Sequence, residues 1–186
     1  MNFDINITVP YVDNLEQRGY ADMIEKLVAE EAKKYNPNEF RVARSKRSIE
    51  DFSFQTDTQS VWFDVKSFDV GSDFSMPNLV SIDRLRKVLT SDSEDLIYIM
   101  VHYRLDHKKR KVIIEEIEFR PVYSIHPSVL AIQNLGKGVL QVKNMHNELL
   151  KYNGTKEDWL FIISGMVYNF YEKQIGKFKR LQKEWE

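Results

Sequence analysis

The sequence predicts an α/β protein in which helices flank a central mixed β-sheet. Apolar residues recur at helical spacing between residues 20 and 35. Segments rich in β-branched and aromatic residues follow in two groups, at 40–68 and 96–119, and a long amphipathic segment closes the chain. The order helix, strands, helix, strands, helix is typical of helices packed around a sheet.

The first predicted elements are a helix and three strands. Asn36-Pro37-Asn38 should end the helix over residues 20–35. Strands are expected at 40–43, about 49–56 and 60–68, and short polar connections make an antiparallel meander the simplest arrangement. The helix carries its apolar residues at Tyr20, Met23, Ile24, Leu27, Val28 and Ala32.

The remaining elements follow from similar signals. Residues 69–80 should form a loop, 82–89 a short helix, and 96–103 and 112–119 two strands joined by a charged turn at 106–110. Prolines 121 and 127 predict an irregular segment before a short strand at 139–142. Thr155 with Asp158 forms a capping box, so a long helix should begin there. Its apolar face would comprise Trp159, Ile162, Ile163, Met166, Phe170, Ile175, Phe178 and Leu181.

Length and composition favour one soluble domain covering residues 1–186. The chain has 42% apolar and 12% aromatic residues, which suffices for a core. It has no cysteine, so disulfides and thiolate metal sites are excluded. We expect a cytoplasmic protein without membrane contact, because no apolar run has spanning length and no signal sequence is evident.

The charge distribution limits where nucleic acid could bind. The formal net charge is -1, so no overall basic field favours DNA. A DNA-binding surface would have to come from two local clusters, one at Arg41, Arg44, Lys46 and Arg47 and the other at 107–111. Basic runs of this length are more often solvated surface than DNA contacts.

The strand at 61–68 carries the strongest chemical signal. Side chains two apart on a strand share a face, so Asp64 and Lys66 should lie side by side. A carboxylate that binds a divalent cation beside an ammonium that meets phosphate or water is the arrangement that metal-dependent phosphodiester hydrolysis requires. An isolated pair of this kind is more often just a charged strand face.

A second carboxylate should arrive from the preceding strand. Asp51 lies in strand-like sequence, whereas Asp57 lies in the polar stretch expected to turn, and Glu50 is a weaker candidate. Two carboxylates at one point repel unless a cation lies between them. Oxygen ligands suit Mg²⁺, for which Mn²⁺ can substitute. We expect Asp51, Asp64 and the Val65 carbonyl to bind the metal and Lys66 to activate or position water.

Asp51 followed by Asp64-Val65-Lys66 resembles the PD-(D/E)xK nucleases, most closely type II restriction endonucleases of the HincII, EcoRV and SwaI kind. The first acid stands thirteen residues before the second, as in the HincII-like pattern. Four further segments are similar to parts of these enzymes: residues 24–28, 62–68, 77–78 (Pro77-Asn78) and 153–159. The resemblance, which covers roughly 20–181, implies a restriction-endonuclease-like fold, a homodimer and blunt cutting of a palindromic DNA site. It also implies that Glu25 lies behind the metal site.

The same resemblance suggests which segments contact DNA. Gln133, Asn134 and Lys137 should read base edges in the major groove, although an ordinary glycine-containing turn is the alternative. Ser75, Met76 and Asn78 should approach the minor groove, and Arg44 and Arg47 should contact phosphates. Two departures stand out. Asp51 lacks a preceding proline, and Ser75 replaces a glutamine, so no sequence preference is carried over.

Two other functions remain open. A repair or junction-resolving nuclease would use the same metal site without a base-reading segment. A non-catalytic DNA-binding domain would keep the fold alone, and the intact Asp51, Asp64 and Lys66 argue against it. The four histidines have no metal-ligand spacing, and Glu115, Glu116 and Glu118 fit an alternating exposed strand face.

Overall fold

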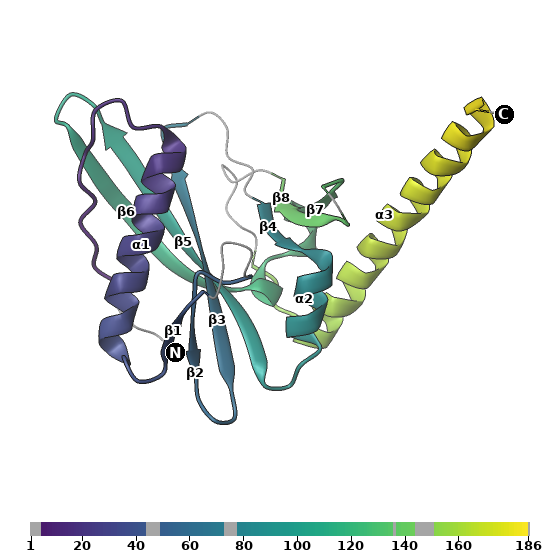
Figure 1. Ribbon diagram of the computed structural model, residues 1–186, viewed down its shortest axis with the longest axis horizontal. Helices are drawn as coiled ribbons and strands as arrows, with labels where there is room; N and C mark the ends of the chain where they lie inside the picture. Colours follow the sequence, from purple (N-terminus) through teal and green to yellow (C-terminus); the bar gives the residue numbers. More distant parts are fainter. Residues whose placement is uncertain (1–4, 44–48, 73–77, 136, 144–150, 186) are drawn as a thin grey trace.

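The structure, a computed structural model, describes residues 5–43, 49–72, 78–135, 137–143 and 151–185. Two sheets and three α-helices make up the described chain (Figure 1). The main sheet has the strand order β1-β2-β3-β5-β6, and the second sheet has the order β4-β8-β7. The main-sheet strands are β1 (Phe40–Val42), β2 (Phe52–Gln55), β3 (Ser60–Asp69), β5 (Glu94–Asp106) and β6 (Lys111–Pro121).

The predicted meander and mixed sheet are confirmed. β1 pairs antiparallel with β2, and β2 pairs antiparallel with β3. β3 then pairs in parallel with β5, with Asp64 opposite Tyr98, and β5 pairs antiparallel with β6. A parallel pair needs a crossover connection, which here runs through β4 (Asn78–Ser81) and α2 (Ile82–Leu89). β3 therefore pairs with β5 along its whole length and with β2 only over residues 60–63.

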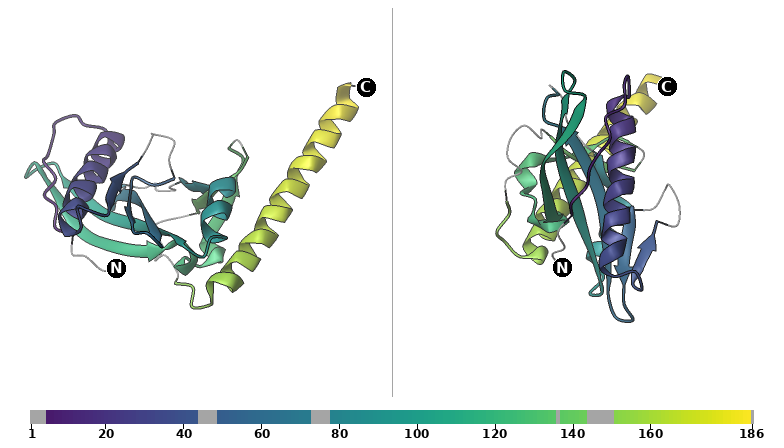
Figure 2. Two further views of the ribbon diagram at one scale, coloured as in Figure 1. Left: turned by 60° about the horizontal axis from the view of Figure 1, so that its bottom comes forward. Right: turned by 90° about the vertical axis from the view of Figure 1, so that its left-hand side faces the viewer.

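Helix α1 (Gln17–Tyr35) covers one face of the main sheet (Figure 2). Tyr20, Ile24, Val28 and Ala32 are buried at the helical spacing seen in the sequence. They pack in one core with Phe63 of β3 and with residues of β5. The predicted helix is therefore confirmed, although it begins three residues earlier than expected.

The opposite face of the sheet is covered by α2, the second sheet and the start of α3 (Lys156–Trp185). Leu85 and Val88 of α2 pack in this second core with Tyr98 and Met100 of β5. Because alternate residues of β3 face different cores, Phe63 and Val65 face α1 while Asp64 and Lys66 face the second core's side. The sheet is thus a layer between helices, as the fold class predicted.

Two strands were missed by the sequence prediction. Residues 78–81, expected in a loop, form β4, where Leu79 and Val80 are buried. β7 (Leu130–Gln133) lies in the segment expected to be irregular and pairs with β8 (Val139–Val142). Both strands are only four residues long and follow prolines. Such short apolar runs did not outweigh the nearby prolines, which predict a loop. The two short 3₁₀ turns Val122–Ser124 and Pro127–Val129 account for the rest of that segment.

Helix α3 begins as predicted, but most of its apolar face does not enter the core. The Thr155 hydroxyl accepts a 3.1 Å hydrogen bond from the backbone N–H of Asp158, which confirms the capping box. Trp159 and Ile163 are buried, and the Trp159 Nε1–H donates a 2.7 Å hydrogen bond to the Ile125 carbonyl. Beyond these turns the helix projects from the body of the molecule (Figures 1 and 2). The predicted long helix is confirmed, and Ile175, Phe178 and Leu181 of its apolar face are exposed.

No helix in the described part of the chain is both long and apolar enough to span a membrane.

Candidate active site

Strand β3 presents an acid–lysine pair at the centre of the main sheet. Nζ of Lys66 lies 2.5 Å from Oδ1 of Asp64, as the strand alternation predicted. The Asp64 side chain is 8% exposed and that of Lys66 is 21% exposed. The carboxylate is therefore fixed inside the fold, while the ammonium is partly exposed to solvent.

Asp51 is tied to the same strand from the neighbouring chain segment. It lies immediately before β2, and its backbone N–H donates a 2.8 Å hydrogen bond to the Phe63 carbonyl. Its side-chain Oδ2 accepts a 2.7 Å hydrogen bond from the Val65 backbone N–H. The structure thus brings Asp51 to Asp64 and Lys66. Asp57, the alternative acid, is exposed at the β2–β3 turn.

Burial and mutual repulsion change the acidity of this cluster. Burial raises the pKa of Asp64 to about 7, the Lys66 ammonium opposes that rise, and the Asp51 carboxylate adds to it. Burial also raises the pKa of Glu25 to about 7, and the adjacent Asp51, within hydrogen-bonding reach, adds to the rise. Glu25 extends from α1 and interacts with Asp51, and its expected place behind the metal site stays a prediction.

The donor set suits a magnesium-like cation with few protein ligands. Within the described residues no group of three or more His, Asp and Glu side chains has the geometry of a metal site. Mg²⁺ is commonly held by one or two carboxylates and completes its shell with water and substrate phosphate. Oδ2 of Asp51 and Oδ1 of Asp64 take part in the hydrogen bonds above, and Asp51 also lies within hydrogen-bonding reach of Asp64 and Glu25. A cation between the carboxylates would replace these contacts between acids. The Asp51 carboxylate raises the pKa of Asp64, and a cation bound between the two would offset this repulsion.

The Val65 carbonyl is directed toward the same position. In a strand the N–H and C=O of one residue point to the same side. The Val65 N–H points to Asp51, past the last pairing between β2 and β3 at Phe52 and Phe63. Its carbonyl therefore also faces the Asp51 side of β3, where a third oxygen ligand would be needed.

Three buried polar residues on this face were not identified from the sequence. Trp62 and Asp64 alternate on β3, and Tyr98 and His102 lie on β5 in register with Asp64 and Phe68. Trp62 Nε1, the Tyr98 hydroxyl and His102 Nε2 are buried without a hydrogen-bond partner among the described residues. Burial, with the Asp64 charge, raises the pKa of Tyr98 well above its ordinary value. Pairing across β3 and β5, invisible in sequence, is what places Tyr98 beside Asp64.

The predicted DNA-reading residues lie on the second sheet. Gln133 ends β7, and Asn134 and Lys137 are exposed in the β7–β8 turn. Lys137 forms a 3.2 Å ion pair with Asp83, and its carbonyl accepts a 2.7 Å hydrogen bond from the Tyr171 hydroxyl. The turn therefore contacts α2 and α3.

The other predicted DNA contacts are only partly described. Asn78 is exposed on β4, where its Oδ1 accepts a 3.2 Å hydrogen bond from Gln141. Ser75, Met76, Arg44 and Arg47 lie outside the described residues.

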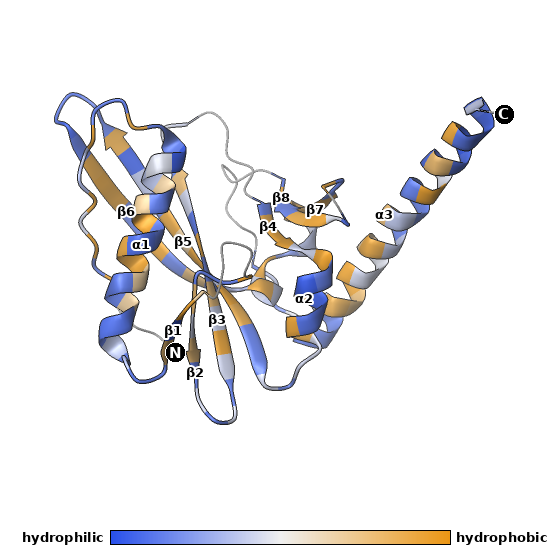
Figure 3. Ribbon diagram, in the orientation of Figure 1, coloured by the Kyte–Doolittle hydropathy of each residue, from blue (hydrophilic) through white to orange (hydrophobic). Residues whose placement is uncertain are grey.

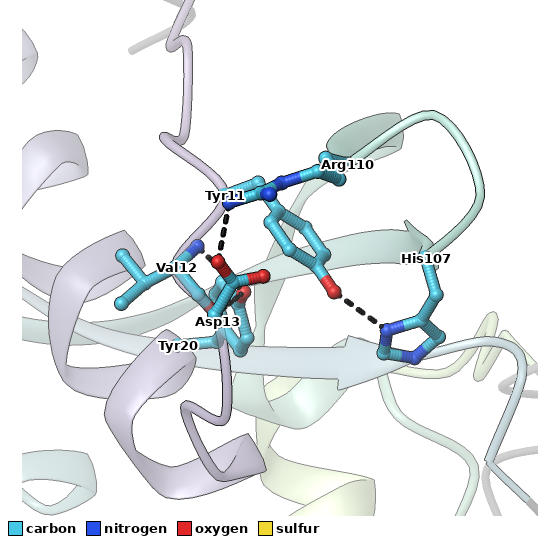
Figure 4. A network of polar contacts seen from close by, with 6 residues as sticks. All are labelled: Tyr11, Val12, Asp13, Tyr20, His107 and Arg110. Carbon is cyan, nitrogen blue, oxygen red and sulfur yellow. Dashed lines mark hydrogen bonds and ion pairs between the residues drawn. The ribbon is translucent and has the colours of Figure 1, made fainter.

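The second basic cluster is already engaged within the chain. Figure 4 shows the segment before α1 crossing the β5–β6 turn. The Tyr11 hydroxyl lies 2.8 Å from His107 Nδ1, and Asp13 forms an ion pair with Arg110. The Tyr20 hydroxyl of α1 donates to the Val12 carbonyl and accepts from its N–H. Residues 107–111 thus help to hold the N-terminal segment in place.

Comparisons with known proteins give a likeness in structure but not in sequence. No protein-family model matches the chain, and a search of curated proteins found no similar sequence. A solved structure of the NlaIV restriction endonuclease is similar, with a TM-score of 0.51 at 14% sequence identity. The likeness covers 83% of this chain and 62% of the NlaIV chain. The fold is therefore restriction-endonuclease-like, and this chain spans less than two thirds of that neighbour's length.

Proposed function

We propose that this chain is a Mg²⁺-dependent type II restriction endonuclease of the PD-(D/E)xK superfamily, acting as a single nuclease domain. The observation that carries the proposal is the convergence of Asp51, Asp64 and Lys66 at one point of β3. The NlaIV-like fold supports the proposal only by analogy. The site residues carry the argument, because one fold can host many functions.

The side chains divide the work of phosphodiester hydrolysis. Asp51 and Asp64, with the Val65 carbonyl, hold Mg²⁺ or Mn²⁺. When bound, such a cation polarises the phosphate and makes a coordinated water a better nucleophile. Lys66 is held beside Asp64 at 2.5 Å, so its ammonium would lie next to a phosphate or water bound at the two aspartates. Glu25 fixes Asp51 from behind and can accept a proton, since its pKa is raised to about 7.

DNA would be bound on both sides of this site. We propose that Arg44 and Arg47 contact phosphates, that Ser75, Met76 and Asn78 approach the minor groove, and that Gln133, Asn134 and Lys137 read base edges. Two copies would each cut one strand of a palindromic site, because two-fold protein symmetry matches two-fold site symmetry. The HincII/EcoRV-like resemblance favours blunt ends, and a restriction enzyme of this kind would act in the cytoplasm.

A repair or junction-resolving nuclease is the second candidate. One observation favours it: Lys137, assigned to base reading, already pairs with Asp83, and the turn around it contacts α2 and α3. A nuclease of that class would keep the Asp51–Asp64–Lys66 site and have no base-specific contacts to lose.

Incubation of the purified chain with plasmid and genomic DNA tests the proposal. A restriction enzyme should linearise plasmid in the presence of Mg²⁺, and sequencing the cut ends should yield one short palindromic sequence. Cutting without a common sequence, but with a preference for branched substrates, would favour the repair nuclease. Failure to cut any DNA with Mg²⁺ or Mn²⁺ would leave the non-catalytic domain as the reading.

A further inference from the structure

The second half of α3 exposes large apolar side chains along one side. Figure 3 shows hydrophobic residues continuing along the helix where it leaves the body of the molecule. Trp185 is 90% exposed and Phe178 is 65% exposed, although both are among the most apolar residue types. The full set is Phe161, Ile162, Tyr168, Tyr171, Ile175, Phe178, Leu181 and Trp185. An exposed apolar run of this length on a helix indicates a protein contact.

Most of these residues follow a heptad repeat. Eight positions between 161 and 185 are spaced alternately by three and four residues, as in a heptad repeat. Six of these eight positions carry aromatic or aliphatic residues. Such a repeat forms a single seam that packs against a second helix. The two polar positions are Ser164 and Gln182. The seam comprises Phe161, Ser164, Tyr168, Tyr171, Ile175, Phe178, Gln182 and Trp185.

The seam lies to one side of the face with which α3 packs on its own chain. Buried Trp159 and Ile163 face the core, and the helix contacts β7 and the two 3₁₀ turns there. At 100° per residue, the seam positions from Tyr168 to Trp185 lie roughly 40–140° around the helix from Ile163, all to the same side of it. A second helix can therefore occupy the seam while Trp159 and Ile163 stay in the core. Tyr171, whose hydroxyl donates to the Lys137 carbonyl of its own chain, lies where the two contact surfaces meet.

The flanking charges favour an antiparallel copy of the same helix. Consider an antiparallel pair in which Ile175 lies opposite Phe178 of the partner subunit. Glu172 then lies beside Lys179 of the partner subunit, and the two-fold axis produces a second, equivalent pair of opposite charges. The same register places Tyr168 opposite Trp185. A parallel pair would instead bring Glu172 near Val167 and Lys179 near Gln174, with no opposite charges. Self-complementarity is thus present only in the antiparallel arrangement.

We propose that residues 168–185 of α3 bind the same segment of a second copy of this chain in an antiparallel helix pair. The exposed aromatic and aliphatic side chains offer on the order of 600 Å² per chain. That approaches the ~800 Å² per partner of a standard stable interface. The pair gives the proposed homodimer a contact surface, yet it rests on the helix alone and requires neither metal nor DNA.

Sedimentation analysis of the whole chain, without metal or DNA, tests the pairing. The unaltered protein should be a dimer. Changing both Ile175 and Phe178 to Lys should weaken dimerisation by at least about tenfold, because buried apolar anchors dominate interfaces. Lys173→Ala, on the polar side of the same helix, is the matched control and should dimerise normally. Circular dichroism should show unchanged melting of the core in all variants.

Disulfide cross-linking tests whether the two helices run antiparallel. The chain has no native cysteine, so only the introduced cysteines can form disulfides. Chains with Tyr168→Cys and chains with Trp185→Cys should form disulfide-linked dimers when mixed under oxidation, and neither should do so alone.

Charge reversal tests the register of the helix pair. Glu172→Lys and Lys179→Glu should each weaken the dimer about fivefold, and the double reversal should restore it.

Three outcomes would overturn the proposal. A monomer at all accessible concentrations would show that the seam binds something other than a second copy. Efficient cross-linking of each single-cysteine chain with itself would show a parallel pair. A double reversal that dimerises no better than either single reversal would exclude the proposed register. None of these results tests the Asp51–Asp64–Lys66 site, because cleavage is not measured. A monomer would also count against a homodimer that forms before DNA is bound.

Discussion

The Val65 backbone N–H donates a 2.7 Å hydrogen bond to Oδ2 of Asp51, so that the first acid of the site is held by the strand that carries the second. Asp51 makes a further backbone bond to Phe63 of the same strand. Its position therefore depends on the local pairing of two neighbouring segments. A substitution at Asp51 that keeps the hydrogen bond to Val65 should therefore change cleavage activity without changing the stability of the fold.

Asp51→Asn should nearly abolish cleavage while the fold persists. The amide oxygen can still accept from Val65, but the negative charge that would bind the cation is lost. We expect a fall in kcat/KM of more than ~100-fold, measured on a plasmid substrate, with little change in melting temperature. Asp57→Asn is the matched control, since that acid is exposed in the β2–β3 turn. Loss of activity in the control alone would move the first metal ligand to Asp57.

Asp64→Ala and Lys66→Ala should each reduce cleavage by more than ~100-fold, because both groups act at the reacting phosphate. Their effects on stability should differ. Lys66→Ala leaves the buried Asp64 without its 2.5 Å partner, so the melting temperature should fall more at pH 8 than at pH 6. Asp64→Ala removes the buried charge itself and should not lower stability at pH 8. Near-normal turnover in either variant would refute the active-site assignment.

The metal-free protein should become more stable as the pH falls from about 8 to about 5.5. The pKa values of Asp64 and Glu25 are raised to about 7 in the folded state, above the ordinary values of 3.8 and 4.5. The folded state therefore binds more protons than the unfolded state between pH 4 and 7, and stability is lost as the pH rises through that window. We expect a shift in melting temperature of roughly 5 °C, which saturating Mg²⁺ at pH 8 should offset.

Asp64→Asn should flatten that pH profile, since it removes one of the two groups that gain protons on folding. Asp83→Asn, an exposed acid paired with Lys137, is the control and should leave the profile unchanged. A melting temperature that rises between pH 5.5 and pH 8 in the unaltered, metal-free protein would contradict the raised pKa values.

The sequence was informative wherever a local pattern determined structure. Strand alternation placed Lys66 beside Asp64, and the capping box located the start of α3, because both depend on residues a few positions apart. The polar stretch at 55–60 correctly predicted the turn that brings Asp51 to β3. These are contacts that backbone geometry alone specifies.

The features that escaped prediction depend on pairing between distant segments. Tyr98 faces Asp64 only because β5 joins β3 in parallel, in a register that the sequence does not encode locally. The β4 and β7 strands are stabilised by β8, which lies far along the chain from β4. The helical period of α3 predicted an apolar face, but periodicity cannot tell which surface that face packs against.

Metal dependence should distinguish the proposed chemistry from metal-free hydrolysis. Two carboxylates and a carbonyl suit Mg²⁺ and Mn²⁺, whereas Ca²⁺ coordinates more loosely and positions water poorly. We therefore expect cleavage with Mg²⁺ or Mn²⁺, and DNA binding without cleavage in Ca²⁺. Parallel gel-shift and cleavage assays check this. Robust cleavage in excess chelator would rule out the mechanism.

Specificity gives the last prediction, which concerns the β7–β8 turn. If Asn134 and Lys137 read base edges, replacing either with Ala should cost ~1–3 kcal/mol at one position of the site and relax preference there. Replacing Arg44 or Arg47 should weaken binding to all sequences alike and reduce the salt dependence, as phosphate contacts do. Binding to a panel of single-base variants of the site supplies the comparison.

Lys137 requires its own control, because it also pairs with Asp83. Asp83→Ala should break that ion pair and free Lys137 for DNA, so binding should be retained or strengthened if the lysine is a base reader. A structural role predicts that Asp83→Ala and Lys137→Ala have the same small effect. A uniform loss of affinity in the Asn134 and Lys137 variants would make the turn a backbone clamp, and the repair nuclease would then become the better reading of the Asp51–Asp64–Lys66 site.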